Sequence, residues 1–357
     1  MKKNLQNLFK KTAQFIFKSF YGNILYSNKA QKIFKKKIAK NKLFKSKRYF
    51  TYSTKNGRIY TDYVQNVAII HKNDLHGDSS FQQVNYRLAS PKNNSVLKKG
   101  TPRIKKKFKG SILSLVQGAS GENYFHWMVD ILPKLMIFSS NYNFNNINYL
   151  YVPELSSVMK ETLNILKIKK KIINSKKFRH VVANEIISTT HPWYHKGTFT
   201  SQSNNIPEWS IKWIRNKFLN HKKKFFIKKK IFLDRSDSKY SHCKLINNDE
   251  IIKFLLKKNF SIIKCSNLNF VKQIFAFWNA SEIVGVHGAA FTNIIFSKSN
   301  TKIFEIKPYG HEGLYYKKIS QINNLNYKSI VSKKKYLKSK SGDIYISIKI
   351  LKDKLGY

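Results

Sequence analysis

The apolar residues between positions 230 and 306 follow two alternating periods. Short apolar runs predict strands at residues 231–234, 261–264, 283–286 and 302–306, and stripes of helical period predict helices at residues 250–256 and 269–278. Asn247 and Glu250 have the spacing of a capping box ahead of the first helix. Strands that alternate with helices over short connections are typical of a parallel sheet covered by helices, so we expect an α/β fold.

The segment from residue 282 to residue 293 is the most informative part of this pattern. It reads Glu-Ile-Val-Gly-Val-His-Gly-Ala-Ala-Phe-Thr-Asn, an apolar strand that runs into a turn of small residues. A helix that starts near Gly288 leaves its first amide N–H groups unpaired, and such groups bind phosphate well. His287 stands at the mouth of the turn. The segment equally fits an ordinary strand-to-helix connection in which the histidine only caps the turn.

Three polar residues stand at or near the carboxyl ends of the predicted strands, where open parallel sheets bind their ligands. Arg235 follows the first strand, His287 follows the third, and Glu305 lies in the fourth. A basic side chain, a phosphate-binding turn and a carboxylate that can accept bonds from ribose hydroxyls together predict a nucleotide site.

A second motif spans residues 121–133, after a predicted strand at residues 112–116. His126, Asp130 and Pro133 are spaced i, i+4 and i+7, so we expect them on one face of a helix that Pro133 kinks. A carboxylate one turn away from an imidazole can orient the ring for acid–base chemistry. The alternative is that the two side chains form a structural pair.

In this order and with these spacings, the two motifs resemble glycosyltransferase family 61, or DUF563, which includes capsular-polysaccharide enzymes. The resemblance covers about residues 112–308. It rests on the Asn-x-x-His-x-x-x-Asp pattern with its following proline, on the strand that ends in Asp234 and Arg235, and on the small-residue turn. Asp234 stands where the family has serine, and Cys243 and Lys244 stand where it has a basic pair, which leaves the phosphate loop with less charge.

The resemblance implies a GT-B fold, in which two Rossmann-like domains face each other across a cleft, and inversion at the anomeric carbon. It implies that either His126 or Asp130 is the catalytic base. Arg235, Lys244 and the Gly288 amides would neutralise the diphosphate, and Glu305 would hold the ribose. The full set of implied nucleotide-sugar-binding residues is Asn123, Arg235, Lys244, His287, Gly288, Ala289, Thr292, Asn293 and Glu305.

The chain contains no Asp-x-Asp pair of the kind that holds a metal on a sugar diphosphate. We therefore expect no metal site and no cofactor beyond the nucleotide sugar as co-substrate. His191 and His195 also have a spacing of four, but Pro192 lies between them without a nearby carboxylate. We expect their aromatic loop to face a sugar and not a metal.

Length and composition suit two domains, because 357 residues with 42% hydrophobic content can form two cores. We predict an amphipathic basic N-terminal extension at residues 1–47 and an acceptor-side α/β domain at residues 48–206. A nucleotide-sugar-binding Rossmann-like domain follows at residues 207–325, and a tail at residues 326–357, in which residues 344–351 alternate like an exposed strand.

The formal net charge of +50 raises the question of the partner. Only seven of the 68 basic residues are arginine, and phosphates bound by lysine alone are held without base specificity. We therefore expect a nucleotide sugar, a glycan or lipid-linked acceptor and an anionic membrane surface as partners, and no nucleic acid. The competing hypothesis is a basic protein that binds nucleic acid or an acidic polymer on a degenerate transferase fold.

Two cysteines exclude a disulfide framework and fit a reducing compartment. No apolar run is long enough for a signal sequence or a membrane span. We expect a cytoplasmic protein whose first 47 residues either lie on the inner face of the membrane or extend from the first domain.

Overall fold

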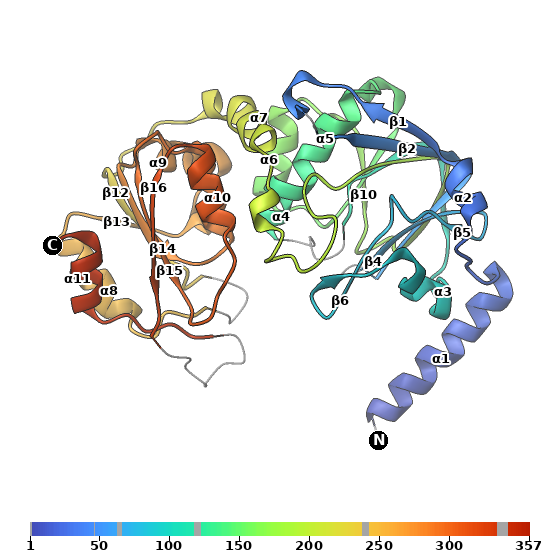
Figure 1. The fold of residues 1–357 in the computed structure, drawn as a ribbon, viewed down its shortest axis with the longest axis horizontal. Coiled ribbons are helices and arrows are strands. Elements are labelled where there is room, and N and C mark those ends of the chain that lie inside the picture. The colour runs from blue at the N-terminus through green and yellow to red at the C-terminus, as the bar shows by residue number, and fades with distance from the viewer. Residues whose placement is uncertain (1, 46, 63–65, 118–122, 238–242, 334–341) are drawn as a thin grey trace. The chain divides into compact units, whose positions relative to one another are not determined.

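The computed structural model describes residues 2–45, 47–62, 66–117, 123–237, 243–333 and 342–357. The chain forms two compact units: the first comprises Met1–Ser156 and Lys167–Gln202, and the second comprises Ser157–Leu166 and Ser203–Tyr357. Each unit combines a β-sheet with helices (Figure 1), so the predicted α/β class is confirmed.

The first unit is built on a mixed β-sheet. Its strands are β1 (Lys35–Ala39), β2 (Tyr49–Lys55), β3 (Gly57–Thr61), β4 (Asn66–His71), β5 (Asp74–Leu75), β6 (Phe81–Val84), β7 (Arg87–Leu88), β8 (Lys106–Ser114), β9 (Tyr149–Val152), β10 (Lys171–Asn174) and β11 (His180–Thr189). The main path runs β10-β9-β8-β11-β3-β4-β6-β7, while β1, β2 and β5 pair beside it. Neighbours from β10 to β11 are parallel, whereas β11 pairs antiparallel with β2 and β3. The unit therefore differs from an all-parallel Rossmann sheet.

The helices of the first unit include α1 (Lys2–Tyr21), α2 (Asn28–Ile33), α3 (Ser95–Lys99), α4 (Tyr124–His126), the π-helix η3 (Trp127–Ile131) and α5 (Leu132–Ser139). Next to Pro133, where the sequence predicts a kink, the chain makes a π-turn in which the N–H of Leu132 bonds the carbonyl of Trp127. Proline has no N–H and its ring crowds the preceding turn, and a turn widened by one residue accommodates both effects. Pro133 then stands in the first turn of α5.

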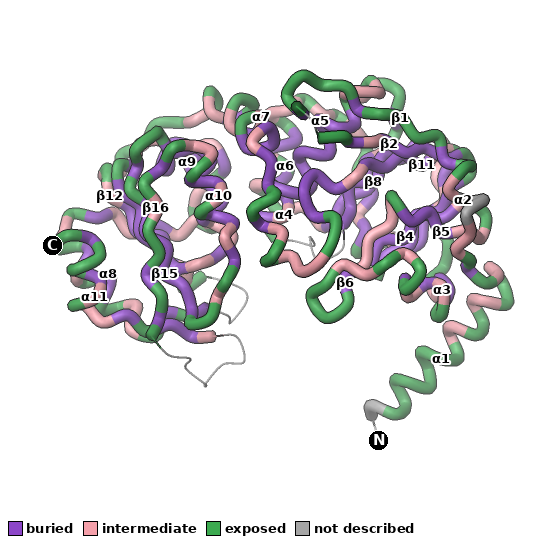
Figure 2. Tube along the Cα trace, in the orientation of Figure 1, coloured by how far each residue is buried: buried purple, intermediate pink, exposed green. Residues whose placement is uncertain are grey.

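Helix α1 is the most exposed element of the first unit (Figure 2). Its C-terminal end contacts the unit through Tyr21, whose ring packs against His180 at 5.4 Å between centroids and carries the Lys105 ammonium at 3.9 Å. None of the helices within the described residues combines the length and the apolarity that a bilayer span requires.

The second unit is a parallel sheet with helices packed on it. Its elements are α6 (Ser157–Ile165), α7 (Glu208–Phe218), β12 (Lys230–Leu233), α8 (Asn248–Lys257), β13 (Ser261–Ile263), α9 (Phe270–Asn279), β14 (Glu282–Val286), the 3₁₀-helix η8 (Ala289–Phe296), β15 (Lys302–Lys307), α10 (Tyr315–Ile322), β16 (Asn326–Val331) and α11 (Ile348–Leu355). The strands are ordered β13-β12-β14-β15-β16 and every pair is parallel. The predicted strands and the two predicted helices are thus confirmed to within about two residues.

The strand order of the second unit determines where a ligand can bind. In sequence order the strands lie as 2-1-3-4-5, so the chain reverses its winding direction between β12 and β14. Side chains that follow these two strands meet at the same edge of the sheet, in the crevice where doubly wound folds bind ligands. Arg235 and His287 occupy these positions.

Two local predictions in this unit are wrong. The side chain of Asn247 does not cap α8 but donates to Glu250 at 2.8 Å and to the carbonyl of Ile346 at 2.9 Å. The expected strand at residues 344–351 is instead a single bridge at Ile344 followed by α11. Its apolar residues join the core formed with α8, and Ser347 caps the helix through Ile350, so burial of one face decides the conformation.

Candidate functional sites

His126 and Asp130 form a close pair in the first unit. The Asn123 side chain begins the helical segment, because its oxygen accepts the backbone N–H groups of Phe125 and His126 at 2.9 and 3.4 Å. One turn later the Nδ1 atom of His126 lies 2.6 Å from Oδ2 of Asp130. The side chain of His126 is 14% exposed and that of Asp130 is 0% exposed, so only the imidazole reaches the surface of this unit.

The Asp130 carboxylate is held by further donors. Trp193 donates its indole N–H to Oδ1 at 2.8 Å, and the Gln117 amide lies 3.5 Å from Oδ2. Hydrogen bonds and nearby positive charge stabilise a carboxyl group that is withdrawn from water. The ammonium group of Lys134, one turn along α5, supplies that charge. The Asp130 carboxyl group is thus held in a fixed position next to the imidazole.

His191 completes this network from the loop after β11. Its Nδ1 accepts the backbone N–H groups of Trp193 and Tyr194 at 3.0 and 2.8 Å, so Nε2 carries the proton of the neutral ring. Nε2 lies 3.8 Å from Oδ1 of Asp130. Burial holds the pKa of His191 well below its usual value, with the positive charge of Lys134 acting in the same direction.

The sheet explains why these loops meet. Because β8 and β11 are parallel neighbours, Gln117 and the loop of Trp193 leave the sheet at the same edge. The aromatic loop is visible in the sequence, but the bond from Trp193 to Asp130 is not. The apolar residues at 181–183 and 186–187, read as one strand, would have placed the loop at this edge.

A second histidine–carboxylate pair lies in the second unit. His287, directly after β14, contacts Oε1 of Glu305 in β15 through its Nδ1, and the Tyr327 hydroxyl of β16 donates to the other carboxylate oxygen. The side chain of Glu305 is 1% exposed, whereas that of His287 is 14% exposed. Both oxygens of Glu305 are therefore engaged within the protein, and Oε1 orients His287, while the ribose contact stays a prediction.

Arg235 and Gly288 are in contact at the point where the sheet reverses its winding. A Cβ atom added to Gly288 would lie 2.6 Å from Nε of Arg235, so a side chain here would displace the guanidinium. The Gly288 carbonyl accepts the Tyr316 hydroxyl at 2.7 Å, which fixes the turn. The first backbone hydrogen bond of η8 is donated by the N–H of Phe291 to the carbonyl of Gly288. The N–H groups of Ala289 and Ala290 lie before this bond in the chain. An arginine beside the first amides of a helix is a kind of arrangement that can bind an anion.

The remaining predicted residues of the second unit have other contacts. Thr292 and Asn293 are buried, and the Asn293 amide donates to Gln273 at 2.9 Å, so the Asn293 side chain supports the turn. Lys244 is exposed, and its backbone carbonyl accepts the N–H of Ile344. Arg235 lies 3.5 Å from the carbonyl of Cys243, whose thiol is buried and has a raised pKa for that reason.

The contacts of Asp234 show what an aspartate does at the position where the resemblance predicts a serine. Its carboxylate accepts the backbone N–H and the hydroxyl of Ser236, both at 2.9 Å, and lies 3.6 Å from Lys264. These bonds shape the turn that carries Arg235. Among the described residues, no group of three or more His, Cys, Asp or Glu side chains is arranged to hold a metal.

The family model of Glycosyltransferase 61 matches residues 124–304, just over half of the chain. The chain belongs to glycosyltransferase family 61. The match includes His126, Asp130, Arg235 and His287. A search of curated proteins returned no match. Among solved structures, a flavo di-iron protein mutant from Thermotoga maritima shows 8% identity and a TM-score of 0.20, over 90% of this chain and 100% of that chain, a likeness too weak to carry an argument.

Proposed function

We propose that the protein is an inverting, metal-independent glycosyltransferase that moves a hexose or pentose from a nucleotide sugar to a glycan or lipid-linked acceptor. Membership of glycosyltransferase family 61 supports sugar transfer. The observation that carries the assignment of the base is the bond from His126 Nδ1 to Asp130 at 2.6 Å. It leaves Nε2 of the more exposed group as the atom that can take a proton.

In the proposed reaction, Nε2 of His126 takes the proton of the acceptor hydroxyl while the hydroxyl oxygen attacks the anomeric carbon. The bond from that carbon to the diphosphate oxygen breaks, and its electron pair leaves with the diphosphate. Asp130 holds the ring orientation and compensates the positive charge that the imidazole gains. Because Asp130 has no exposed surface, it acts on the reaction through His126.

The leaving diphosphate is stabilised in this proposal by the second unit. Arg235 lies beside Gly288, and the Ala289 and Ala290 amides follow at the start of η8, where the helix dipole favours an anion. His287 stands beside them with its orientation fixed by Glu305. We propose that the two units form a GT-B enzyme, with the acceptor on the first unit and the donor on the second.

A panel of nucleotide sugars tests this function. A true donor present at 100 times its dissociation constant should stabilise the protein by about 2.7 kcal/mol, and the same compound should support transfer to a glycan acceptor. If the protein is instead a basic polymer-binding protein, no nucleotide sugar will shift its melting temperature, and its affinity for polyanions will collapse with salt.

We further propose that α1 places the enzyme on an anionic membrane surface. Its apolar residues recur every three or four positions, and Phe9, Phe15 and Phe20 are 76, 74 and 76% exposed. Lys10, Lys11 and Lys18 lie outside this apolar stripe, and the helix contains no acidic residue. An apolar stripe bordered by lysines is the pattern of helices that lie in the interface of anionic bilayers.

Vesicle sedimentation tests the role of α1. The protein should bind phosphatidylglycerol vesicles and not phosphatidylcholine vesicles, and a Phe9→Ser, Phe15→Ser double variant should lose this binding. A matched control replaces Tyr86 and Ile104, which are 83 and 81% exposed elsewhere in the same unit. Equal loss in both variants would remove α1 from the proposal.

A further inference from the structure

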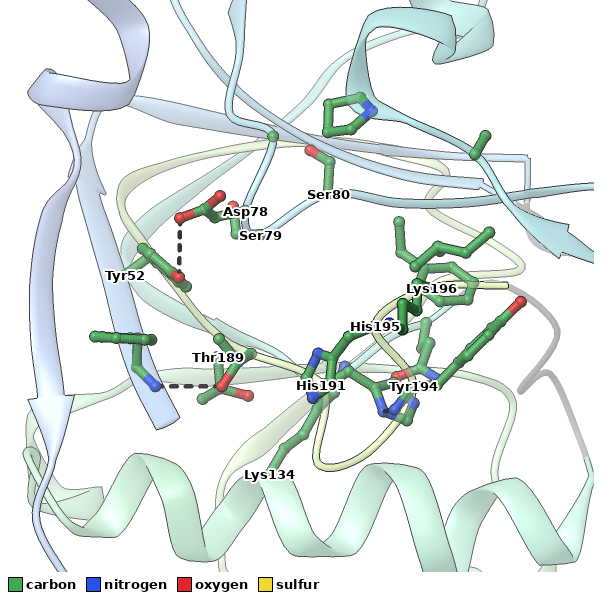
Figure 3. Close-up of a pocket in the computed structure, with 18 of the residues that line it drawn as sticks. Tyr52, Asp78, Ser79, Ser80, Lys134, Thr189, His191, Tyr194, His195 and Lys196 are labelled. Carbon is green, nitrogen blue, oxygen red and sulfur yellow. Dashed lines mark hydrogen bonds between the residues drawn. The ribbon is translucent and has the colours of Figure 1, made fainter. Parts of the chain in front are cut away.

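The first unit contains a cavity of about 660 Å³ that the proposed reaction does not use (Figure 3). Its wall includes Gln117, Lys134 and His191, the three residues that also surround Asp130. Neither His126 nor Asp130 lines it. Its volume is in the range of pockets that bind small ligands, so it can hold one or two sugar rings.

The charge of this cavity is positive. Lys36, Arg48, Lys134 and Lys196 line it, with Asp78 as the carboxylate on its wall. Asp78 is already paired, because it accepts from Lys36 at 3.3 Å and from the Tyr52 hydroxyl at 3.2 Å. The cavity therefore offers cations that its own acidic group does not neutralise.

Lys134 is the distinctive cation among them. Its side chain belongs to a residue only 6% exposed, and within the described part of the chain it forms no ion pair at 4.0 Å or less. Burial lowers its pKa to about 8, with Asp130 acting in the opposite direction, so the ammonium is mostly charged at pH 7. A buried ammonium on a cavity wall is stabilised when an anion occupies the cavity.

Two buried polar atoms on the wall have no hydrogen-bond partner within the residues that the structure describes. They are the Thr189 hydroxyl, in a residue 5% exposed, and Nε2 of His191, in a residue 9% exposed. Because Nδ1 of His191 accepts two backbone bonds, Nε2 is a donor. Buried polar atoms without partners are uncommon, and both of these residues line the cavity.

Aromatic rings complete the surface. Phe50, Tyr52, Phe81 and Tyr194 line the same cavity. Flat aromatic faces pack against the apolar C–H face of a sugar ring, while the cations and donors bind its charged and hydroxyl groups. This combination suits a charged sugar better than a free inorganic anion or an apolar molecule.

We propose that this cavity binds a sugar that carries a carboxylate or a phosphate, as part of the acceptor glycan. The assignment of this sugar as the acceptor rests on the proposed transferase function. The binding of a charged sugar rests on the residues that line the cavity. According to this proposal, the acceptor glycan carries an acidic group, and Lys134 is the residue that binds this group.

Calorimetry on the full chain in 150 mM salt tests the site, with three probes: a uronic-acid disaccharide, the same disaccharide with its carboxyl group reduced, and a hexose phosphate. At least one charged probe should bind tenfold or more tightly than the reduced one, and the tighter of the two identifies the anion. Lys134→Met should weaken that binding at least tenfold, whereas Lys98→Met, at an exposed position of α3, should leave it unchanged.

Two further variants keep the test decisive if Lys134→Met folds poorly. Arg48→Gln and Thr189→Val alter the wall without touching Asp130, and each should weaken the charged probe with an unchanged melting temperature. Equal binding of charged and reduced probes, or no effect of these variants, overturns the proposal. A loss of nucleoside diphosphate affinity in Lys134→Met would overturn it in favour of a donor role. Because no turnover is measured, binding can succeed or fail independently of sugar transfer.

Discussion

His126 donates through Nδ1 to Oδ2 of Asp130 at 2.6 Å, while Asp130 also accepts the indole N–H of Trp193 at 2.8 Å. The carboxylate therefore fixes both the tautomer and the orientation of the ring. Sequence spacing left open which of the pair takes the proton. The difference in exposure, 14% against 0%, assigns the proton transfer in our proposal to the imidazole.

Substitutions of His126 and Asp130 should lower the turnover of sugar transfer without lowering the affinity for the nucleotide. We expect His126→Ala and Asp130→Asn to lower sugar-transfer turnover by about 100-fold or more, since the base is absent in one and its tautomer is no longer held in the other. Nucleotide affinity should stay nearly unchanged, because both residues lie in the first unit. Initial rates and calorimetry on the same preparations measure the two quantities.

Trp193→Phe serves as the control for that experiment. It removes one donor to Asp130 and leaves the bond to His126, so it should lower the stability of the protein by about 1–3 kcal/mol with a smaller loss of turnover. A purely structural role for the pair predicts that lost transfer follows the unfolded fraction in every variant. That result would defeat the catalytic assignment.

Arg235→Ala should weaken the binding of a nucleoside diphosphate. A hydrogen bond to a charged group contributes about 1.5–3 kcal/mol, and we expect the affinity to fall by that amount. Lys253→Ala, at an exposed position of α8, removes the same formal charge from the same unit and should have little effect. Calorimetry that finds both variants equal to the wild type would exclude Arg235 from the site.

Gly288→Ala should reduce the same affinity by steric displacement. The added methyl group would lie 2.6 Å from Nε of Arg235, and a flexible side chain can move away at little cost to folding. The backbone of Gly288 is extended, which alanine can adopt. We expect weaker diphosphate binding with an almost unchanged melting temperature.

Gly285→Ala provides the contrast to this variant. Its methyl group would lie 2.6 Å from Cβ of Leu233 in the neighbouring strand, which cannot move freely. Overpacking of that kind costs about 1–3 kcal/mol of stability. Identical melting temperatures and affinities for the two glycine variants would contradict the proposed geometry of the turn.

The stability of the protein should depend on pH through Lys134. Burial lowers the pKa of this lysine from 10.5 to about 8, so above pH 8 the unfolded chain binds this proton more tightly than the folded one. The contribution of Lys134 to stability therefore rises between about pH 8 and pH 10.5. The unfolding free energy of the wild type minus that of Lys134→Met should therefore increase by on the order of 3 kcal/mol between pH 7 and pH 10.

Urea unfolding at the two pH values measures this difference. Lys98→Met should show no such change, because Lys98 is exposed. If the difference between wild type and Lys134→Met does not vary with pH, then Lys134 is not a buried ammonium.

The sequence by itself determined the parallel sheet of the second unit, the family and the pairing of His126 with Asp130. These features depend on local periods: apolar runs for strands, stripes for helices, and one helical turn between an imidazole and a carboxylate. Local periodicity survives folding because each element must bury its apolar face. The position of Arg235 and His287 at the carboxyl ends of their strands follows from the same rule.

Only the tertiary structure decided which groups surround these residues. Trp193 reaches Asp130 across 63 positions, and Tyr327 reaches Glu305 across 22, separations that carry no period in the sequence. The mixed sheet of the first unit brings the ends of β8 and β11 together, and this strand pairing creates both the Asp130 network and the basic cavity beside it. Register between distant strands is set by packing of the whole sheet, so residues such as Lys134 and His191 acquire their roles only when the chain is folded.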